Sequence, residues 1–152
     1  MFWFLGELDY GRENCFSFWG REIMRINWVE EMRQFAKECA SLYKKIFLVW
    51  DLGAGKTTFV QWFMEWLWHN PDIVHSPTYT YLNIYHDEIL HLDLYRLESE
   101  SDFVEKWILD QMLSYEIILV EWPRFEEMYR DEERVTIKIE KISEQEREIT
   151  IS

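Results

Sequence analysis

The chain has 152 residues, a length that fits one domain with a single sizeable core. Hydrophobic residues make up 48% and charged residues 30% of the sequence, which is the composition of a globular rather than a disordered protein. The formal net charge of −13 argues against broad nucleic-acid binding, because most of the surface repels phosphate backbones. Any role in nucleic-acid metabolism is expected to be indirect, through another protein.

The cysteines and the first residues bear on the compartment. Cys15 and Cys39 lie far apart and form no C-x-x-C motif, so we expect inert thiols in a reducing cytoplasm. The opening MFWFLGELDYGREN has no basic leader and no long apolar run, so no signal peptide is expected. The most apolar helical stretch, FVQWFMEWLWH, is too short to span a bilayer. We therefore expect one cytoplasmic domain, residues 1–152, with no membrane partner.

The N-terminal part predicts edge strands followed by a helix. Residues 14–26 could supply one or two edge strands. Within residues 27–43 apolar side chains recur at helical spacing, which predicts an amphipathic helix that ends near Tyr43. Asn27, with Glu30 three positions later, matches an N-cap and capping box at the start of this helix.

A buried strand and a buried helix are predicted next. The sequence KIFLVW, residues 45–50, is a short continuous apolar run, typical of a strand that is covered on both faces. A glycine-containing loop follows. The helix predicted from about Thr57 to His69 has apolar side chains on nearly every side, so we expect it to pack into the protein.

Residues 75–85 and 89–97 predict two strands joined by a short turn at residues 86–88. Because side chains alternate along a strand, three leucines of the second strand should share one face and three polar-capable residues the other. These two sets are Leu90, Leu92 and Leu94, and His91, Asp93 and Tyr95.

The remaining sequence predicts a helix over residues 98–114, with acidic residues at its start, and a buried strand over residues 116–123. Residues 134–142 and 147–152 alternate like a terminal hairpin. Helices that interleave with apolar strands indicate an α/β protein. We expect a mixed, mainly parallel central sheet with antiparallel additions, whose strand order the sequence does not give.

Residues 48–58, LVWDLGAGKTT, match most of the phosphate-loop pattern G-x-x-x-x-G-K-[ST]. Gly53 and Gly55, with Ala54 between them, let successive main-chain N–H groups approach a phosphate at the start of a helix. Lys56 can reach the β- and γ-phosphates, and the Thr57 hydroxyl can bind Mg²⁺. The alternative is a chance sequence at the start of a helix.

Trp50 occupies the first glycine position of that pattern. If the main chain there needs a positive φ, tryptophan costs about 1–2 kcal/mol relative to glycine. We expect an ordinary φ at Trp50 and a loop that still binds nucleotide.

Acids at strand ends are the candidates for handling metal and water. Glu121 follows four apolar residues, and Asp93 is the second candidate; the alternatives are a solvated strand-end acid and a hairpin-edge charge. His91 is expected to be a satisfied, partly buried histidine rather than a catalytic base. Ser76 and Thr78 could turn hydroxyls towards the metal, or serve only the turn. The spacing of the four histidines does not suggest a zinc site.

Four stretches, DLGAGKTTF, SPTYT, HLDLYRLES and VEWP, resemble the bacterial TsaE (YjeE) family in their order and rough spacing, over about residues 27 to 123. The resemblance implies a P-loop NTPase-like three-layer fold and an ATPase that depends on Mg²⁺. It implies association with TsaB and TsaD, the pair that transfers threonylcarbamoyl to tRNA, and contact with tRNA only indirectly.

By position, the resemblance makes Lys56, Asp93 and Glu121 catalytic, and makes Thr57 and Glu121 the magnesium ligands. Ser76 and Thr78 resemble a first, nucleotide-sensing switch, and Asp93 lies in a second switch needed for hydrolysis. The implied nucleotide-binding residues are Leu52, Gly53, Ala54, Gly55, Lys56, Thr57, Thr58, Ser76, Thr78 and Trp122.

Two other hypotheses stay open. A small-molecule kinase could use the same loop with arginines closing over the transferred phosphate, although no lid segment is apparent. The arginines that could be recruited are Arg96, Arg124, Arg130 and Arg134. Alternatively, Trp50 could close the pocket and leave a non-catalytic binding module.

Overall fold

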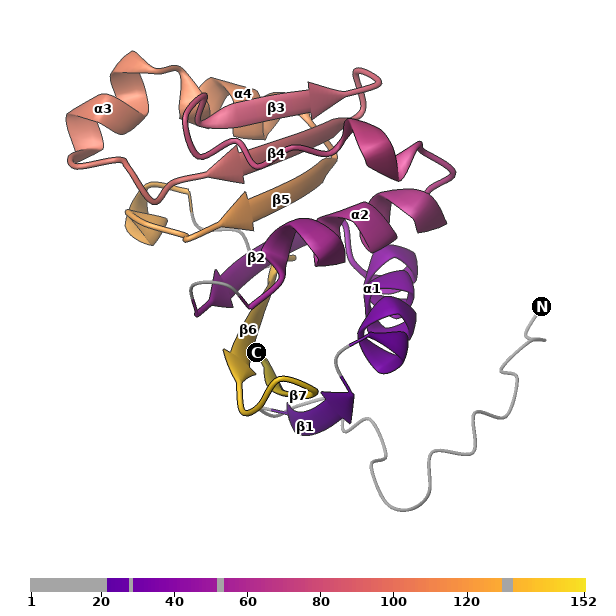
Figure 1. Ribbon diagram of the computed structural model, residues 1–152. Helices are drawn as coiled ribbons and strands as arrows, with labels where there is room; N and C mark the ends of the chain where they lie inside the picture. The colour runs from indigo at the N-terminus through magenta and orange to yellow at the C-terminus, as the bar shows by residue number, and fades with distance from the viewer. Residues whose placement is uncertain (1–21, 28, 52–53, 130–132) are drawn as a thin grey trace.

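A computed structural model describes residues 22–27, 29–51, 54–129 and 133–152. Its centre is a seven-stranded sheet in the order β1-β7-β6-β2-β5-β4-β3 (Figure 1). The strands are β1 (Glu22–Asn27), β2 (Lys45–Trp50), β3 (Leu82–Tyr85), β4 (Ile89–Asp93), β5 (Ile117–Glu121), β6 (Val135–Lys141) and β7 (Glu146–Ile151). The four neighbours β6, β2, β5 and β4 run parallel, whereas β3, β7 and β1 are antiparallel additions. The predicted α/β class with a mainly parallel centre is confirmed.

Helices cover both faces of the sheet and so make three layers (Figure 1). They are α1 (Glu30–Leu42), α2 (Lys56–Trp66), α3 (Glu100–Glu105) and α4 (Ile108–Ser114), with short 3-10 turns at η1 (Pro71–Ile73) and η2 (Glu126–Met128). Along β2, Ile46 and Leu48 belong to the core under α1 and α2, while Phe47 belongs to the core under α3 and α4. The expectation that this strand is covered on both faces is therefore correct.

The start of α1 differs from the prediction. The helix begins at Glu30, and Val29 stands at its N-cap position without a side-chain cap. Asn27 cannot cap it because its main chain is still in β1, paired with Glu146 of β7. Its N–H donates instead to the carboxylate of Glu31. Of the edge strands expected within residues 14–26, the part before residue 22 lies outside the described residues.

The predicted helix over residues 98–114 is two helices. The chain breaks at Trp107, whose φ of 58° is left-handed, after the Ser99–Asp102 capping box has started α3. In one continuous helix, Phe103 and Ile108 would point about 140° apart, since each residue advances about 100°. The break lets both side chains enter the same core cluster, so burial overrides local helix propensity.

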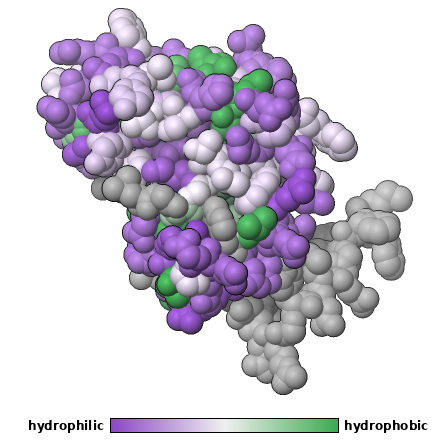
Figure 2. Space-filling view, viewed as in Figure 1, coloured by the Kyte–Doolittle hydropathy of each residue, from purple (hydrophilic) through white to green (hydrophobic). Residues whose placement is uncertain are grey.

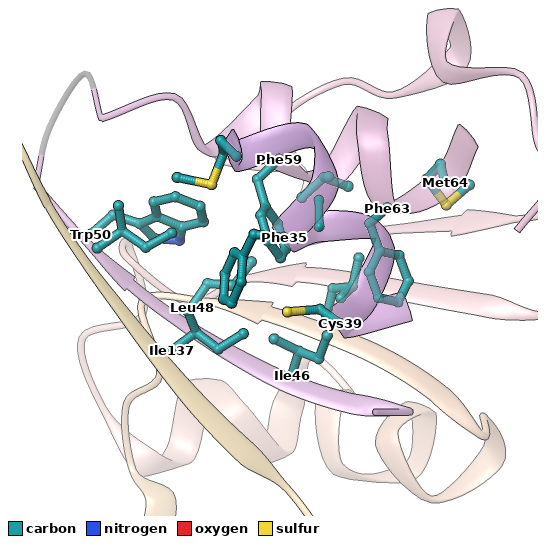
Figure 3. Close-up of a cluster of buried hydrophobic side chains, with 14 of the residues drawn as sticks. Phe35, Cys39, Ile46, Leu48, Trp50, Phe59, Phe63, Met64 and Ile137 are labelled. Carbon is teal, nitrogen blue, oxygen red and sulfur yellow. The ribbon is translucent and has the colours of Figure 1, made fainter. Parts of the chain in front are cut away.

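The helix α2 begins at Lys56 and ends at Trp66, three residues before the predicted end. Its inward face buries Phe59 and Phe63; Phe59 packs against Trp50, and Phe63 lies farther along the helix on the side of Cys39 and Ile46 (Figure 3). The opposite face of α2 is partly exposed to solvent, and Trp68, just after the helix, is 93% exposed. The expected burial of this helix therefore holds for one face only.

The predicted hairpins at β3–β4 and β6–β7 are both present. The strands of the first are shorter than predicted: β3 starts at Leu82 rather than residue 75, because the N–H groups of Thr80 and Tyr81 donate to the Pro77 carbonyl in a turn, and β4 ends at Asp93 rather than residue 97. The face seen in Figure 2 is mostly hydrophilic, with small and separate hydrophobic patches. Among the described helices, none has the length and apolar character needed to cross a membrane.

Candidate active site

The loop between β2 and α2 has the strand–loop–helix context that a phosphate loop requires. Gly55 has a φ of 96°, a left-handed value at which a Cβ atom would cost about 1–2 kcal/mol. Ala54 is buried, and its N–H donates to the Asp51 carbonyl over 3.1 Å. Helix α2 has no side-chain cap, so the first N–H groups of Lys56 and Thr57 keep no partner within the helix. Those N–H groups and the helix dipole favour an anion there.

Two of the expected nucleotide-binding residues, Leu52 and Gly53, lie outside the described residues. Thr57 and Thr58 stand in the first turn of α2 and are half-buried. The described part of the loop is therefore Asp51 and the stretch from Ala54 to the start of α2.

Trp50 is the last residue of β2 and has no positive φ, as expected. Its side chain is only 2% exposed and lies in the core with Phe59 and Leu48, as Figure 3 shows. The Trp50 side chain, which stands where the pattern has its first glycine, therefore fills the space between β2 and α2. The indole N–H has no hydrogen-bond partner among the described residues.

The phosphate-loop lysine contacts the segment that follows β5. The ammonium of Lys56 lies 4.6 Å from the centre of the Trp122 ring, a cation–π contact. Trp122 has a φ of 53°, and its N–H donates to the Leu48 carbonyl over 3.1 Å. The same ring lies 5.4 Å from that of Tyr95. Residues distant in sequence, Lys56 and Trp122, are thereby brought together at the carboxyl ends of β2 and β5.

Both candidate acids are buried at that same edge. Asp93, the last residue of β4, is paired in register with Glu121, the last residue of β5. Glu121 is 0% and Asp93 1% exposed, so neither the solvated-acid nor the hairpin-edge alternative describes them. Because parallel strands present their carboxyl ends at one edge, these acids lie on the side of the sheet where β2 enters the loop.

Asp93 is held by the expected switch residues. Its Oδ2 accepts a hydrogen bond from the Thr78 hydroxyl over 2.6 Å, and Thr78 is in turn 2.7 Å from the Ser76 hydroxyl. Its Oδ1 accepts from the Tyr95 N–H over 2.9 Å. The structure thus joins the SPTYT stretch to the HLDLYRLES stretch through the Asp93 carboxylate.

Glu121 is held on one side only. Its Oε1 lies 2.8 Å from Nε2 of His91; this histidine has a partner at each ring nitrogen, as expected, but is fully rather than partly buried. Its Oε2 is buried and has no hydrogen-bond partner among the described residues. An unpaired buried carboxylate oxygen is costly unless a ligand uses it.

The donor set fits Mg²⁺. One or two carboxylates and a hydroxyl, all oxygen ligands, are what this ion takes from proteins, the rest being water and phosphate. Oε2 of Glu121 supplies the free carboxylate oxygen, and the Thr57 hydroxyl stands at the start of α2. In the described part of the chain, no group of three or more His, Cys, Asp and Glu side chains could hold a metal by itself.

Sequence reasoning missed Asn83 and Tyr85 of β3. Tyr85 Oη lies 3.3 Å from Nδ1 of His91, on the side of the ring away from Glu121. The hairpin register, which sets Asn83 opposite His91, and strand alternation put all three on one face. That signal was available once the turn at residues 86–88 was assigned.

Comparisons with known proteins cover most of the chain. A family model described as "Threonylcarbamoyl adenosine biosynthesis protein TsaE" matches residues 26–149. A Bacillus subtilis (strain 168) protein named tRNA threonylcarbamoyladenosine biosynthesis protein TsaE is 39% identical over 130 residues, covering 81% of this chain and 80% of the relative. A Rickettsia bellii protein of the same name is 36% identical over 103 residues, covering 64% of this chain and 71% of the relative. A crystal structure of Bacillus subtilis YdiB superposes with a TM-score of 0.66 at 32% identity, over 87% of this chain and 84% of that one.

Proposed function

This chain belongs to the TsaE family of threonylcarbamoyl adenosine biosynthesis proteins, and from that premise we propose that it is a Mg²⁺-dependent ATPase serving tRNA threonylcarbamoyladenosine modification. The resemblance expected from four short motifs is confirmed. The observation that carries the proposal is the contact of the Lys56 ammonium with Trp122, the residue next to buried Glu121. It joins the phosphate loop to the acid that would serve the metal.

Each residue has a role in this proposal. Lys56 and the N–H groups at the start of α2 bind the β- and γ-phosphates. Thr57 and Glu121 hold Mg²⁺, which when bound neutralises charge on the phosphate oxygens. Asp93 positions the attacking water, whose oxygen bonds to the γ-phosphorus as the bond to the β–γ bridging oxygen breaks; one water proton stays with the phosphate and the other is released to solvent, giving ADP and phosphate. Thr78 keeps Asp93 in place through its 2.6 Å hydrogen bond.

The partners in this proposal are TsaB and TsaD in the cytoplasm, with tRNA reached only through them. The net charge of −13 supports an indirect relation to RNA, because the chain has few positive charges to spare for a phosphate backbone. Hydrolysis is expected to be slow for the chain alone and faster when TsaB and TsaD are present. ATP turnover would reset the complex and would not act on the RNA itself.

Replacing Lys56 with alanine tests the assigned site. Loss of a charge-assisted contact of about 1.5–3 kcal/mol should weaken ADP binding about 10- to 100-fold in calorimetry with Mg²⁺, and abolish ATP hydrolysis. Lys37→Ala is the matched control, because Lys37 makes a comparable contact with Trp66, 4.2 Å from its ring centre, between α1 and α2. Unchanged hydrolysis in Lys56→Ala would refute the site.

The two other hypotheses gain no support from the geometry. A closed pocket would need the Trp50 ring in the nucleotide space, and the ring lies in the core. Of the arginines considered for a kinase lid, Arg96 packs on Tyr79 at 4.3 Å and Arg134 pairs with Glu126 at 2.7 Å, while Arg130 lies outside the described residues. A phosphorylated product in a screen of small acceptors would favour the kinase.

A further inference from the structure

Behind Glu121 lies a buried line of hydrogen-bonding groups that the proposed function does not use. Nε2 of His91 is 2.8 Å from Oε1 of Glu121, and Nδ1 of the same ring is 3.3 Å from Oη of Tyr85. Tyr85 Oη is also 3.2 Å from the His75 carbonyl. The line therefore runs from the proposed metal acid, across β4 and β3, to the residue just before Ser76.

The number of protons decides which of these contacts is a hydrogen bond. The Tyr85 hydroxyl has a single proton and two acceptors in reach, the His75 carbonyl and Nδ1 of His91. Asn83 already donates to the His75 carbonyl over 2.9 Å, and to Tyr85 Oη over 3.3 Å. The His75 carbonyl can accept from both side chains, but it keeps the Asn83 hydrogen bond when the hydroxyl turns away, whereas the buried Nδ1 of His91 would lose its Tyr85 partner; the hydroxyl proton is therefore assigned to His91.

A hydrogen bond from the Tyr85 hydroxyl to Nδ1 fixes the tautomer of the His91 imidazole. A neutral imidazole carries its own proton on one nitrogen, so accepting at Nδ1 leaves the N–H at Nε2. That N–H then donates to Oε1 of Glu121. In the other tautomer, a nitrogen lone pair would face the carboxylate across 2.8 Å, which is repulsive when both groups are without a proton there.

We propose that Tyr85 is a positioning residue which, by fixing His91 as the Nε2–H tautomer, holds Oε1 of Glu121 and leaves Oε2 for the metal. This inference rests on the proposed function, since it assigns Oε2 to Mg²⁺. It gives a reason for the one-sided hydrogen bonding of Glu121, whose second oxygen is the buried one without a partner among the described residues. Groups behind a metal ligand commonly orient it in this way.

Burial supports the role of the hydroxyl as a proton donor. Tyr85 is a core residue, and its burial raises the pKa of the phenol above its ordinary value of 10.0, with a smaller opposing effect from Asn83. The hydroxyl therefore keeps its proton throughout the neutral pH range. The ring itself packs near the His91 ring, with centroids 6.1 Å apart, so a phenylalanine can occupy the same space.

The test compares Tyr85→Phe with wild type by calorimetry, measuring ADP affinity with and without Mg²⁺. The variant should bind ADP alone as wild type does, whereas the gain in affinity that Mg²⁺ provides should fall about 10-fold. Tyr129→Phe is the matched control, because it too removes the hydroxyl of a buried tyrosine, which in this case donates to the main-chain carbonyl of Arg124 over 2.6 Å. The Tyr129→Phe variant should keep the full gain in ADP affinity that Mg²⁺ provides. An unchanged Mg²⁺ gain in Tyr85→Phe would overturn the proposal.

A second readout separates this inference from the proposed function. Long-range ¹H–¹⁵N NMR of the imidazoles, without nucleotide, reports the tautomer of His91, assigned by the loss of its signals in His91→Asn. We expect the Nε2–H form in wild type and a mixture or the Nδ1–H form in Tyr85→Phe. An Nδ1–H form in wild type would overturn the positioning role even if the variant fails to fold. If wild-type ADP binding does not respond to Mg²⁺, the proposed function itself fails.

Discussion

The ring of Trp50 packs edge-on against the ring of Phe59, with centroids 5.5 Å apart and planes at 71°. Trp50 ends β2 and Phe59 lies in the first turns of α2, so the contact joins the two sides of the phosphate loop. Such aromatic pairs contribute about 0.5–1.5 kcal/mol beyond their buried area. The residue that departs from the phosphate-loop pattern thus belongs to the core under the loop.

Replacing Trp50 with glycine, which restores the usual pattern, should therefore destabilise the protein. Loss of a fully buried ring costs about 3–5 kcal/mol in the free energy of unfolding, measured by denaturant titration. Trp50→Phe should lose less, because it keeps an aromatic ring against Phe59. Trp68→Gly is the control: its ring is 93% exposed and its φ of 64° suits glycine, so no comparable loss is expected. A loss below about 1 kcal/mol for Trp50→Gly would contradict the packing described.

Replacing Asp93 with asparagine should separate binding from hydrolysis. The amide keeps the shape but loses the charge that orients water, so ATP hydrolysis should fall about 100-fold or more while ADP binding persists. Turnover is measured with TsaB and TsaD present, and binding by calorimetry. Asp110→Asn, at an exposed site in the first turn of α4, serves as the control. Equal losses of binding and turnover would point to a structural role for Asp93.

Cys39 should resist modification in the folded protein. Its side chain is buried in α1, and burial raises the pKa of the thiol well above its ordinary 9.0, so the reactive thiolate is scarce. In a Cys15→Ser background, a thiol reagent at pH 8 should react with Cys39 only as fast as the protein opens. Full labelling in native buffer at the rate of a free thiol would contradict this burial.

Stability should decline in alkaline solution. The folded-state pKa of Cys39 is raised above its unfolded value of 9.0 by burial, so folding favours the protonated form. The contribution of Cys39 to the free energy of unfolding is complete below pH 9. It is lost as the pH rises above 9, and the free energy of unfolding then falls by up to about 1.4 kcal/mol per pH unit. Burial raises the pKa of Tyr85 and Tyr129 as well, which extends the decline above their ordinary value of 10.0.

Unfolding titrations at pH 8, 9 and 10 measure this slope. Cys39→Ala should flatten the slope between pH 9 and 10, which lies above the ordinary pKa of the thiol and below that of the tyrosines. The same slope in Cys39→Ala and in the parent protein would assign the alkaline loss to other groups.

The sequence alone determined the elements whose signals are local. Continuous apolar runs predicted β2 and β5, alternation predicted the hairpins, and the glycines before Lys56 predicted the loop that ends where α2 begins. These predictions hold because strand and helix periodicity and turn chemistry depend on neighbouring residues.

The tertiary structure decided everything that depends on distant partners. β6 lies beside β2, although about 85 residues separate them in the sequence, because the open side of β2 accepts a parallel neighbour. Pairing of Asn27 with β7 moved the start of α1, and the shared core of Phe103 and Ile108 broke a helix that local propensity would have continued.

The same holds for the candidate site. Residue types placed Lys56, Asp93 and Glu121 among its members, but only the parallel register put the two acids side by side. Only packing turned Trp50 inward, and only the β3–β4 pairing set Tyr85 behind His91. Strand pairing and burial depend on contacts between residues far apart in the chain, and a local sequence pattern does not say which distant residues will meet.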